Sequence, residues 1–256
     1  MNDGTSKIKP AVAMVGCGHW GKNLARNFAR LGALTSVTDH DAATARNVST
    51  ELGVPHLSWE QVLESSDVDA MAIAAPAKLH AYLVDAALDA GKDVYVEKPL
   101  ALDLGEAEHL WSKSERDGRV LMVGHLLQYH PAFVKLRQIV RSGWLGPLQY
   151  IYSNRLNFGK IRIAENILWS FAPHDISMIL SLTGQEPNEV TAVGAYYLHG
   201  QIADVTTTHM GFPNGERAHT FVSWLHPFKE QKLVAVGETG MATFDDSQSW
   251  ECKLVY

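Results

Sequence analysis

The first half of the chain alternates between short apolar runs and helical patterns, and this alternation constrains the fold more than any other feature. The apolar runs are typical of buried strands and lie at residues 11–16, 34–37, 70–75, 94–97 and 120–124. Amphipathic helical patterns separate them, and several end in a glycine, which commonly terminates a helix. Such alternation indicates a parallel sheet with helices on both faces. We therefore predict an α/β domain, a doubly wound parallel sheet, over residues 1–124.

The pattern changes after about residue 125. Helical patterns remain at 131–143 and 172–184, but most of the segment consists of runs rich in β-branched and aromatic residues, joined by turn sequences such as FPNGER. These runs predict a second domain over residues 125–256, of the α+β class, with a large and mostly antiparallel sheet.

Composition excludes several classes of partner. The net charge is −6 and no lysine or arginine run exceeds a dipeptide, so the basic surface that nucleic acids or anionic membranes require is missing. The polar N-terminal residues and the lack of a long apolar stretch favour a cytoplasmic protein. Cys17 and Cys252 cannot form a disulfide framework, and neither the cysteines nor the histidines have metal-ligand spacing, so we expect no metal site.

The first strand leads into a glycine-rich turn, Gly16-x-Gly18-x-x-Gly21. Such a turn lets the backbone approach a pyrophosphate at a helix N-terminus, although glycine-rich turns also occur without nucleotides. Asp39 closes the second strand 18 residues after Gly21, where a carboxylate can bind the ribose hydroxyls of NAD and repel a 2′-phosphate. Its alternative role is a helix N-cap. Asp41 adds negative charge, and the sequence therefore predicts NAD as the cofactor.

Other unusual residues also follow strands. They are AAP at 74–76, EKP at 97–99 and GH at 124–125. Because ligands bind outside the carboxyl ends of the strands in an open parallel sheet, we expect one cleft there, with Lys98 toward its nicotinamide end. The alternative is a surface lysine in a turn made by Pro99.

A second group of candidates lies in the second domain. Pro173, His174 and Asp175 are predicted to open a helix, which would place His174 at the helix start near an interdomain crevice. The alternative is a capping His-Asp pair. Arginine and asparagine side chains nearby could bind an anionic, polyhydroxyl ligand. The candidate substrate contacts are Arg155, Asn157, Arg162, Trp169 and His174.

Together these motifs resemble the glucose-fructose oxidoreductase / inositol dehydrogenase / MocA (Gfo/Idh/MocA) family, and the resemblance covers essentially the whole chain. The segments GHLLQYHPA, YSNRLNFGK, ENILWSFAPHDIS and SWLHPFKEQKLV resemble the branch that oxidises UDP-N-acetylglucosaminuronic acid at C3, in nucleotide-sugar biosynthesis for surface polysaccharides.

The resemblance implies roles for individual residues. Lys98 would accept the proton of the reacting hydroxyl, and His174 would hydrogen-bond that hydroxyl or relay its proton. Many relatives have an aspartate four residues before the histidine, where this chain has Ser170, so an acid-base relay of two residues is expected. The expected cofactor-binding residues are Gly16, Gly18, His19, Trp20, Gly21, Asp39, Ala75, Pro76, His80, Glu97 and Lys98.

The resemblance also implies a homo-dimer or tetramer. Relatives usually continue past the last residue of this sequence, so we expect the second domain to be incomplete and truncated at the C-terminus. The alternative functions are a UDP-N-acetylglucosamine 3-dehydrogenase, another sugar or inositol dehydrogenase, an NAD-dependent glycosidase, and an inactive NAD-binding scaffold.

Overall fold

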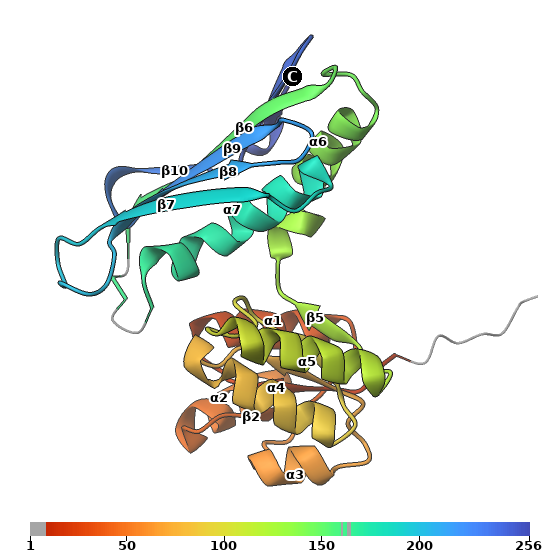
Figure 1. Ribbon diagram of the computed structural model, residues 1–256. Helices are drawn as coiled ribbons and strands as arrows, with labels where there is room; N and C mark the ends of the chain where they lie inside the picture. Colours follow the sequence, from red (N-terminus) through yellow and green to blue (C-terminus); the bar gives the residue numbers. More distant parts are fainter. Residues whose placement is uncertain (1–8, 160, 163–164) are drawn as a thin grey trace, which may run out of the picture. The chain divides into compact units, whose positions relative to one another are not determined.

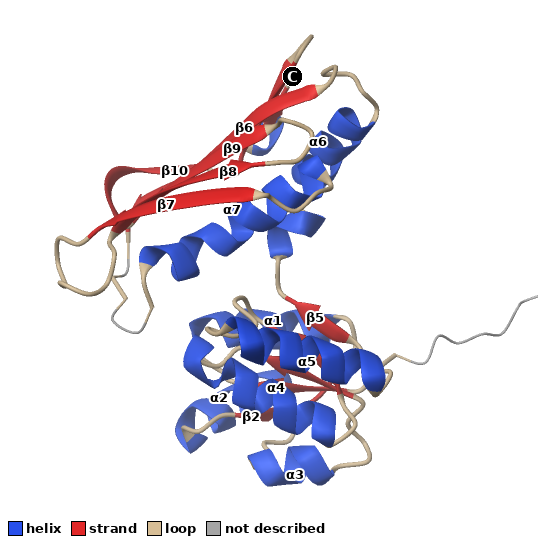
Figure 2. Cartoon of the chain, viewed as in Figure 1, coloured by secondary structure: helices blue, strands red, loops and turns tan. Residues whose placement is uncertain are grey.

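The computed structural model describes residues 9–159, 161–162 and 165–256. The chain divides into two compact units, the first ending at Gly124 and the second beginning at His125 (Figure 1). Helices and strands alternate in the first unit, whereas strands dominate the second (Figure 2).

The first unit is a parallel sheet of five strands in the order β2-β1-β3-β4-β5. This arrangement confirms the predicted doubly wound sheet. Its strands are β1 Val12–Val15, β2 Leu34–Thr38, β3 Ala70–Ile73, β4 Asp93–Val96 and β5 Leu121–Val123. Its helices are α1 His19–Arg30, α2 Ala42–Leu52, α3 Trp59–Glu64, α4 His80–Asp89 and α5 Leu104–Arg116, with a 3₁₀ turn η1 at Ala77–Leu79.

Alternation along each strand supplies apolar side chains to both faces of this sheet. Val12 and Met14 of β1 pack in one cluster with apolar residues of α1 and α2. Ala13 and Val15 pack in another cluster, with apolar residues of α3, α4 and α5. Because both faces are covered, the strands read as continuous apolar runs, and the ligand-binding positions are left at the strand ends.

The second unit contains a sheet of seven strands in the order β12-β11-β10-β6-β9-β8-β7. The prediction of a mostly antiparallel sheet is confirmed, and β6 and β9 form its single parallel pair among the described residues. The strands are β6 Leu148–Phe158, β7 Glu189–Ala195, β8 Val205–Gly211, β9 Arg217–Ser223, β10 Leu225–Gly237, β11 Met241–Asp245 and β12 Leu254–Val255. The helices are α6 Pro131–Arg141 and α7 Ile167–Thr183, with 3₁₀ turns η2 Leu126–Tyr129 and η3 Trp250–Cys252.

Helices α6 and α7 cover one face of this sheet (Figure 1). Phe133 of α6 and Ile179 of α7 share a buried cluster with Ile151 of β6 and Leu233 of β10. The edge strand β7 is exposed along nearly its whole length. The predicted dimer or tetramer stays a prediction.

Helix α7 begins earlier than the sequence predicted. Its N-cap is Asn166, whose side chain accepts a hydrogen bond from the backbone N–H of Trp169, and Pro173 lies inside the helix. The prediction that Pro173 opens the helix is therefore wrong, and His174 lies in its middle. The prediction relied on the preference of proline for the first helical turn, but here the asparagine cap begins the helix, which continues through the proline.

None of the helices among the described residues combines the length and apolar character needed to cross a membrane.

Candidate functional site

The glycine turn after β1 has a different requirement at each of its three glycines. Gly16 has a φ of +89°, and a Cβ there would lie 2.9 Å from the backbone of Ala74. A Cβ on Gly21 would overlap the carbonyl oxygen of Gly16, so this glycine permits close packing of α1 on the turn. Gly18 caps α1 and has no atom within 4 Å of its Cβ position. The turn therefore presents open space and backbone N–H groups at the start of a helix, as binding of an anion requires.

Asp39 is held against this turn. One carboxylate oxygen accepts a hydrogen bond of 2.6 Å from the backbone N–H of Cys17, and the other accepts one of 2.9 Å from the N–H of Asp41. The Asp39 side chain is 8% exposed. The cap of α2 is instead Asp41, whose side chain accepts from the N–H groups of Ala43 and Thr44. The alternative role of Asp39 as the N-cap is therefore excluded, and its carboxylate is fixed at the end of β2.

A cavity of about 820 Å³ opens at this edge of the sheet. Five of the predicted cofactor residues line it: Gly16, Gly18, Asp39, Ala75 and Pro76. The cavity combines an open glycine turn, the Asp39 carboxylate and apolar walls. These residues fit the adenosine and phosphate part of NAD.

One wall of the cavity was missed by sequence reasoning. Residues 56–59 line it, together with Lys78, Leu79 and Leu83. The segment before α3 runs beside β2, because Val37 donates to the carbonyl of Pro55 and accepts from the N–H of Leu57. The capping box of Ser58 and Gln61 then starts α3. That Ser-x-x-Gln pattern was the available signal, but it indicates a helix start rather than a ligand.

Glu97 directly follows β4 and is hydrogen-bonded to the helix that begins at the glycine turn. Its Oε1 accepts hydrogen bonds of 2.7 Å from the indole N–H of Trp20 and 2.9 Å from the hydroxyl of Tyr95. A Cβ on Gly124 would lie 2.6 Å from the Tyr95 hydroxyl oxygen, so the glycine makes room for this group. Glu97 is 9% exposed. The predicted contact of Glu97 with a cofactor ribose stays a prediction, while its link to the α1 residue Trp20 is a feature of the structure.

The remaining predicted cofactor residues lie around the cavity rather than in its lining. His19 is exposed at the start of α1, and Lys98 is half-buried at the end of β4. His80 is buried, with both ring nitrogens facing backbone carbonyl oxygens. Direct binding of the cofactor by His80 therefore does not fit the structure, because the ring is already used within the protein.

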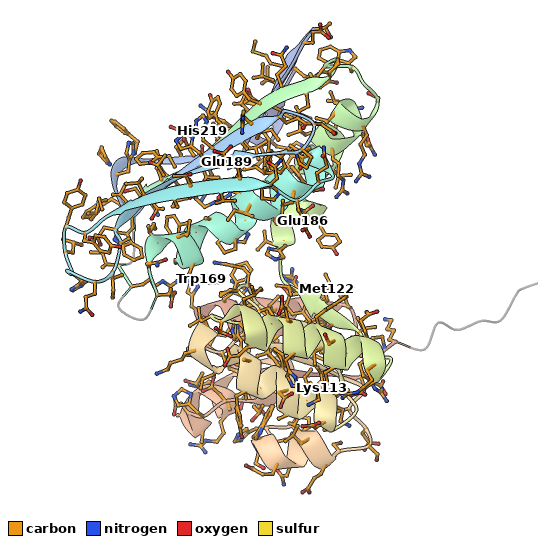
Figure 3. All side chains as sticks on the ribbon, viewed as in Figure 1. Lys113, Met122, Trp169, Glu186, Glu189 and His219 are labelled. Atoms are coloured by element: carbon orange, nitrogen blue, oxygen red, sulfur yellow. The ribbon has the colours of Figure 1, made fainter. Side chains whose placement is uncertain are left out.

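In the second unit, the predicted substrate residues differ in their surroundings. Trp169 lies in the first turn of α7 and is 40% exposed (Figure 3). His174 is half-buried, and Ser170, one turn earlier on the same face of the helix, is buried. Asn157 is half-buried near the end of β6. The Arg162 side chain is 45% exposed and lies 3.6 Å from a carboxylate oxygen of Glu165.

Arg155 is different from these, because its guanidinium is buried beneath α7. Its Nε donates to Oδ2 of Asp175 at 2.6 Å and its Nη2 donates to Oδ1 at 3.2 Å. The Asp175 carboxylate also accepts from the hydroxyl of Ser153. With its side chain 9% exposed and paired in this way, Arg155 holds α7 on the sheet. We therefore do not retain it as a substrate contact.

No group of three or more histidine, cysteine or acidic side chains within the described part of the chain is arranged to hold a metal ion. Cys17 lies buried in the glycine turn. Burial, reinforced by the negative charge of Asp39, raises the pKa of its thiol to about 11. The thiol is therefore protonated at neutral pH, and the turn presents no thiolate nucleophile.

Models of two protein domains match the chain. Residues 11–125 match the oxidoreductase family domain with an NAD-binding Rossmann fold, and residues 133–243 match the GFO/IDH/MocA C-terminal domain.

Two relatives show how much of a family member the chain represents. It is 33% identical over 217 residues to the UDP-N-acetylglucosamine 3-dehydrogenase of Acidithiobacillus ferrooxidans, and the aligned region covers 84% of this chain and 67% of that protein. It is 31% identical to the myo-inositol dehydrogenase Hyg17 of Streptomyces leeuwenhoekii, covering 76% of this chain and 62% of the relative. The chain thus spans about two thirds of the length of these relatives.

Solved structures agree with these matches to family domains and relatives. The crystallised UDP-N-acetylglucosamine 3-dehydrogenase of A. ferrooxidans superposes with a TM-score of 0.85 at 30% identity, over 93% of this chain and 74% of that one. The scyllo-inositol dehydrogenase of Lactobacillus casei, solved with NAD(H) and scyllo-inositol, has the same fold, with a TM-score of 0.83 at 20% identity over 96% and 81% of the two chains. The chain is a member of the GFO/IDH/MocA family of NAD-binding oxidoreductases.

Proposed function

We propose that this protein oxidises the C3 hydroxyl of a UDP-linked N-acetylated amino sugar to the 3-keto sugar, with NAD as the hydride acceptor. The observation that carries the proposal is its 33% identity over 217 residues to a UDP-N-acetylglucosamine 3-dehydrogenase. The fixed Asp39 carboxylate beside the open glycine turn supports NAD as the cofactor.

In this reaction NAD, when bound, takes the hydride that leaves C3. Lys98, half-buried just after β4, accepts the proton of the 3-hydroxyl, and this role requires a neutral amine. His174 donates a hydrogen bond to the reacting hydroxyl or relays its proton. Glu97 and Trp20 keep the end of β4 beside the glycine turn.

The sugar itself is either neutral or a uronic acid. We favour the neutral N-acetylglucosamine type, because the buried ion pair with Asp175 removes Arg155 from the residues that could bind a uronate. The uronic acid is the second candidate. The half-exposed Arg162 supports it, since an arginine can bind a carboxylate through paired hydrogen bonds.

The test is to incubate the protein and NAD with UDP-N-acetylglucosamine, UDP-N-acetylglucosaminuronic acid, UDP-glucose and myo-inositol, and to follow NADH formation and product mass. We expect NADH and a product lighter by two hydrogens with an N-acetylated UDP-sugar. Deuterium at C3 of that sugar should appear in the reduced cofactor and slow turnover.

Other outcomes would point to the alternatives. Oxidation of myo-inositol alone would replace the nucleotide-sugar proposal with an inositol dehydrogenase. Cleavage of a glycoside without net NADH would indicate a glycosidase, in which the cofactor is regenerated in each cycle. Binding of NAD with no turnover on any sugar would leave only a cofactor-binding scaffold.

A further inference from the structure

The side chain of His80 joins two loops of the first unit. It lies at the first residue of α4 and is 1% exposed. Its Nδ1 is 2.6 Å from the carbonyl oxygen of Pro99, and its Nε2 is 2.8 Å from the carbonyl oxygen of Ala75. Because a backbone carbonyl only accepts hydrogen bonds, a hydrogen bond at either contact requires a proton on the ring nitrogen that faces it. The neutral ring can donate to one carbonyl at a time, and the fully protonated ring to both.

Both loops belong to the candidate site. Ala75 follows β3 and lines the cavity. Pro99 follows Lys98 directly. On the other side of Lys98, Glu97 is held by the indole of Trp20. Lys98 therefore lies between two neighbours that are anchored to two different parts of the cofactor-binding edge.

We propose that His80 is a positioning residue: by tying the loop after β4 to the wall of the cavity, it fixes where Lys98 presents its amine. The inference rests on the proposed function, in which Lys98 accepts the proton of the substrate. His80 acts only through the backbone on either side of it and does not contact the reacting atoms.

The expected effect is on turnover more than on cofactor binding. Misplacing a catalytic group by about 1 Å can cost about 10²-fold in rate. We therefore expect His80→Ala to lower kcat by roughly 10- to 100-fold, with a smaller change in the KM for NAD.

Lys92 provides a matched control in the same unit. Its buried ammonium donates hydrogen bonds of 2.6 Å and 2.8 Å to the carbonyl oxygens of Ser65 and Val68. It therefore also bridges two backbone carbonyls, but it precedes β4 and does not line the cavity. Lys92→Met should lower the melting temperature and leave kcat near the parent value. If the two variants lower kcat to the same extent at equal loss of stability, His80 is a structural residue only.

Two conservative variants separate the two hydrogen bonds. The amide nitrogen of an asparagine can take the place of Nδ1, which faces Pro99, and that of a glutamine can take the place of Nε2, which faces Ala75. Because Pro99 adjoins Lys98, His80→Asn should recover more of the kcat than His80→Gln. The reverse order would contradict the proposed route through Pro99.

Two measurements that do not depend on catalytic turnover test the inference independently. In His80→Ala, amide hydrogen exchange should accelerate in peptides covering residues 73–79 and 94–102, and acetylation of Lys98 by acetic anhydride should change in rate. Lys92→Met should leave both unchanged. Unaltered exchange and acetylation in His80→Ala would overturn the inference. By contrast, parental turnover in Lys98→Met, or no oxidation of any sugar by the parent, would remove the proposed function while these measurements still decide the role of His80.

Discussion

The guanidinium of Arg155 is hydrogen-bonded twice to the carboxylate of Asp175, the residue that follows His174 in α7. The pair connects the middle of β6 to the middle of the helix, and both side chains are almost fully buried. Because Asp175 is adjacent to His174, the pair also restrains the segment of α7 that carries the proposed proton relay.

Breaking this pair should destabilise the protein. Asp175→Ala leaves a buried arginine without its carboxylate, and we expect a loss of about 3–5 kcal/mol in the free energy of unfolding. The double variant Arg155→Met, Asp175→Leu removes both charges and should recover most of the loss. Chemical denaturation of the three proteins is the measurement. A single variant as stable as the parent would show that the pair contributes little.

Replacing Lys98 with methionine should stop turnover without unfolding the protein. The substitution keeps most of the side-chain volume but removes the proton acceptor, and general-base catalysis is worth about 10²- to 10⁴-fold. We expect kcat to fall by that factor, with NAD affinity and melting temperature unchanged. His174→Ala should lower kcat less than Lys98→Met does if the histidine only orients the hydroxyl. If Lys98→Met lowers kcat by no more than about threefold, a loss far smaller than the expected one, Lys98 is a turn residue.

Asp39 should set the preference for NAD over NADP. Its carboxylate accepts from the N–H groups of Cys17 and Asp41, so Asp39→Ala loses both the charge and two hydrogen bonds to the backbone. Asp39→Asn keeps one oxygen acceptor without the charge. Calorimetric titration should show weaker NAD binding and a smaller preference for NAD over NADP in both variants. Asp39→Asn should retain more stability than Asp39→Ala. Tighter binding of NADP than of NAD by the parent would contradict this role.

Stability should fall on mild acidification because of two histidines in the second unit. Burial, assisted by nearby His209, lowers the pKa of His219, and burial lowers the pKa of His130. In the unfolded chain these two histidines take up protons near the ordinary histidine pKa of about 6.5, whereas in the folded protein they do so only at lower pH. The stability that the two neutral histidines contribute to the folded state is fully present above that pH. It is lost as the pH falls toward their lower pKa values in the folded protein.

The measurement is the melting temperature between about pH 7.5 and pH 5, above the range in which carboxylates titrate. His219 lies on β9, on the face of the sheet opposite α7 (Figure 3), where its ring stacks on that of Tyr152. His219→Phe keeps an aromatic ring there and should flatten the pH dependence. The exposed His199, changed to glutamine, serves as the control. An equal slope in His219→Phe and the parent would rule out His219 as a source.

The two cysteines should differ in reactivity. Cys17 is buried and its thiol pKa is raised to about 11, whereas Cys252 is exposed. A maleimide at neutral pH should therefore label Cys252 in the native protein and reach Cys17 only after denaturation. Mass spectrometry of digested protein identifies the labelled position. Rapid native labelling of Cys17 would show that the glycine turn opens readily.

The sequence predicted those parts of the fold and site that depend on local pattern. The parallel sheet follows from alternating runs, and the glycine turn and Asp39 follow from their positions after β1 and β2. The Trp20–Glu97 hydrogen bond joins residues 77 positions apart, and no local pattern indicates it. The wall at residues 56–59 was missed for the same reason.

The side of β6 on which Arg155 lies could not be read from the strand either. Polar residues occur on both faces of β6, since Ser153 and Arg155 are buried while Asn154 between them is half-buried. Alternation fixes which residues share a face, but here it does not reveal which face is covered. The partner Asp175, 20 residues later, determines that Arg155 is structural.

The position of β6 in the sheet also bears on the order in which the second unit can assemble during synthesis. It is the first strand of the unit to leave the ribosome, yet its neighbours in the sheet are β9 and β10, and Asn154 is bonded to Glu230, 76 residues later. Contacts of such long range form late. Until β10 has emerged, an edge of β6 stays unpaired, and unpaired strand edges are a common route to aggregation. A nascent chain would therefore be most in need of a chaperone between the synthesis of β6 and that of β10.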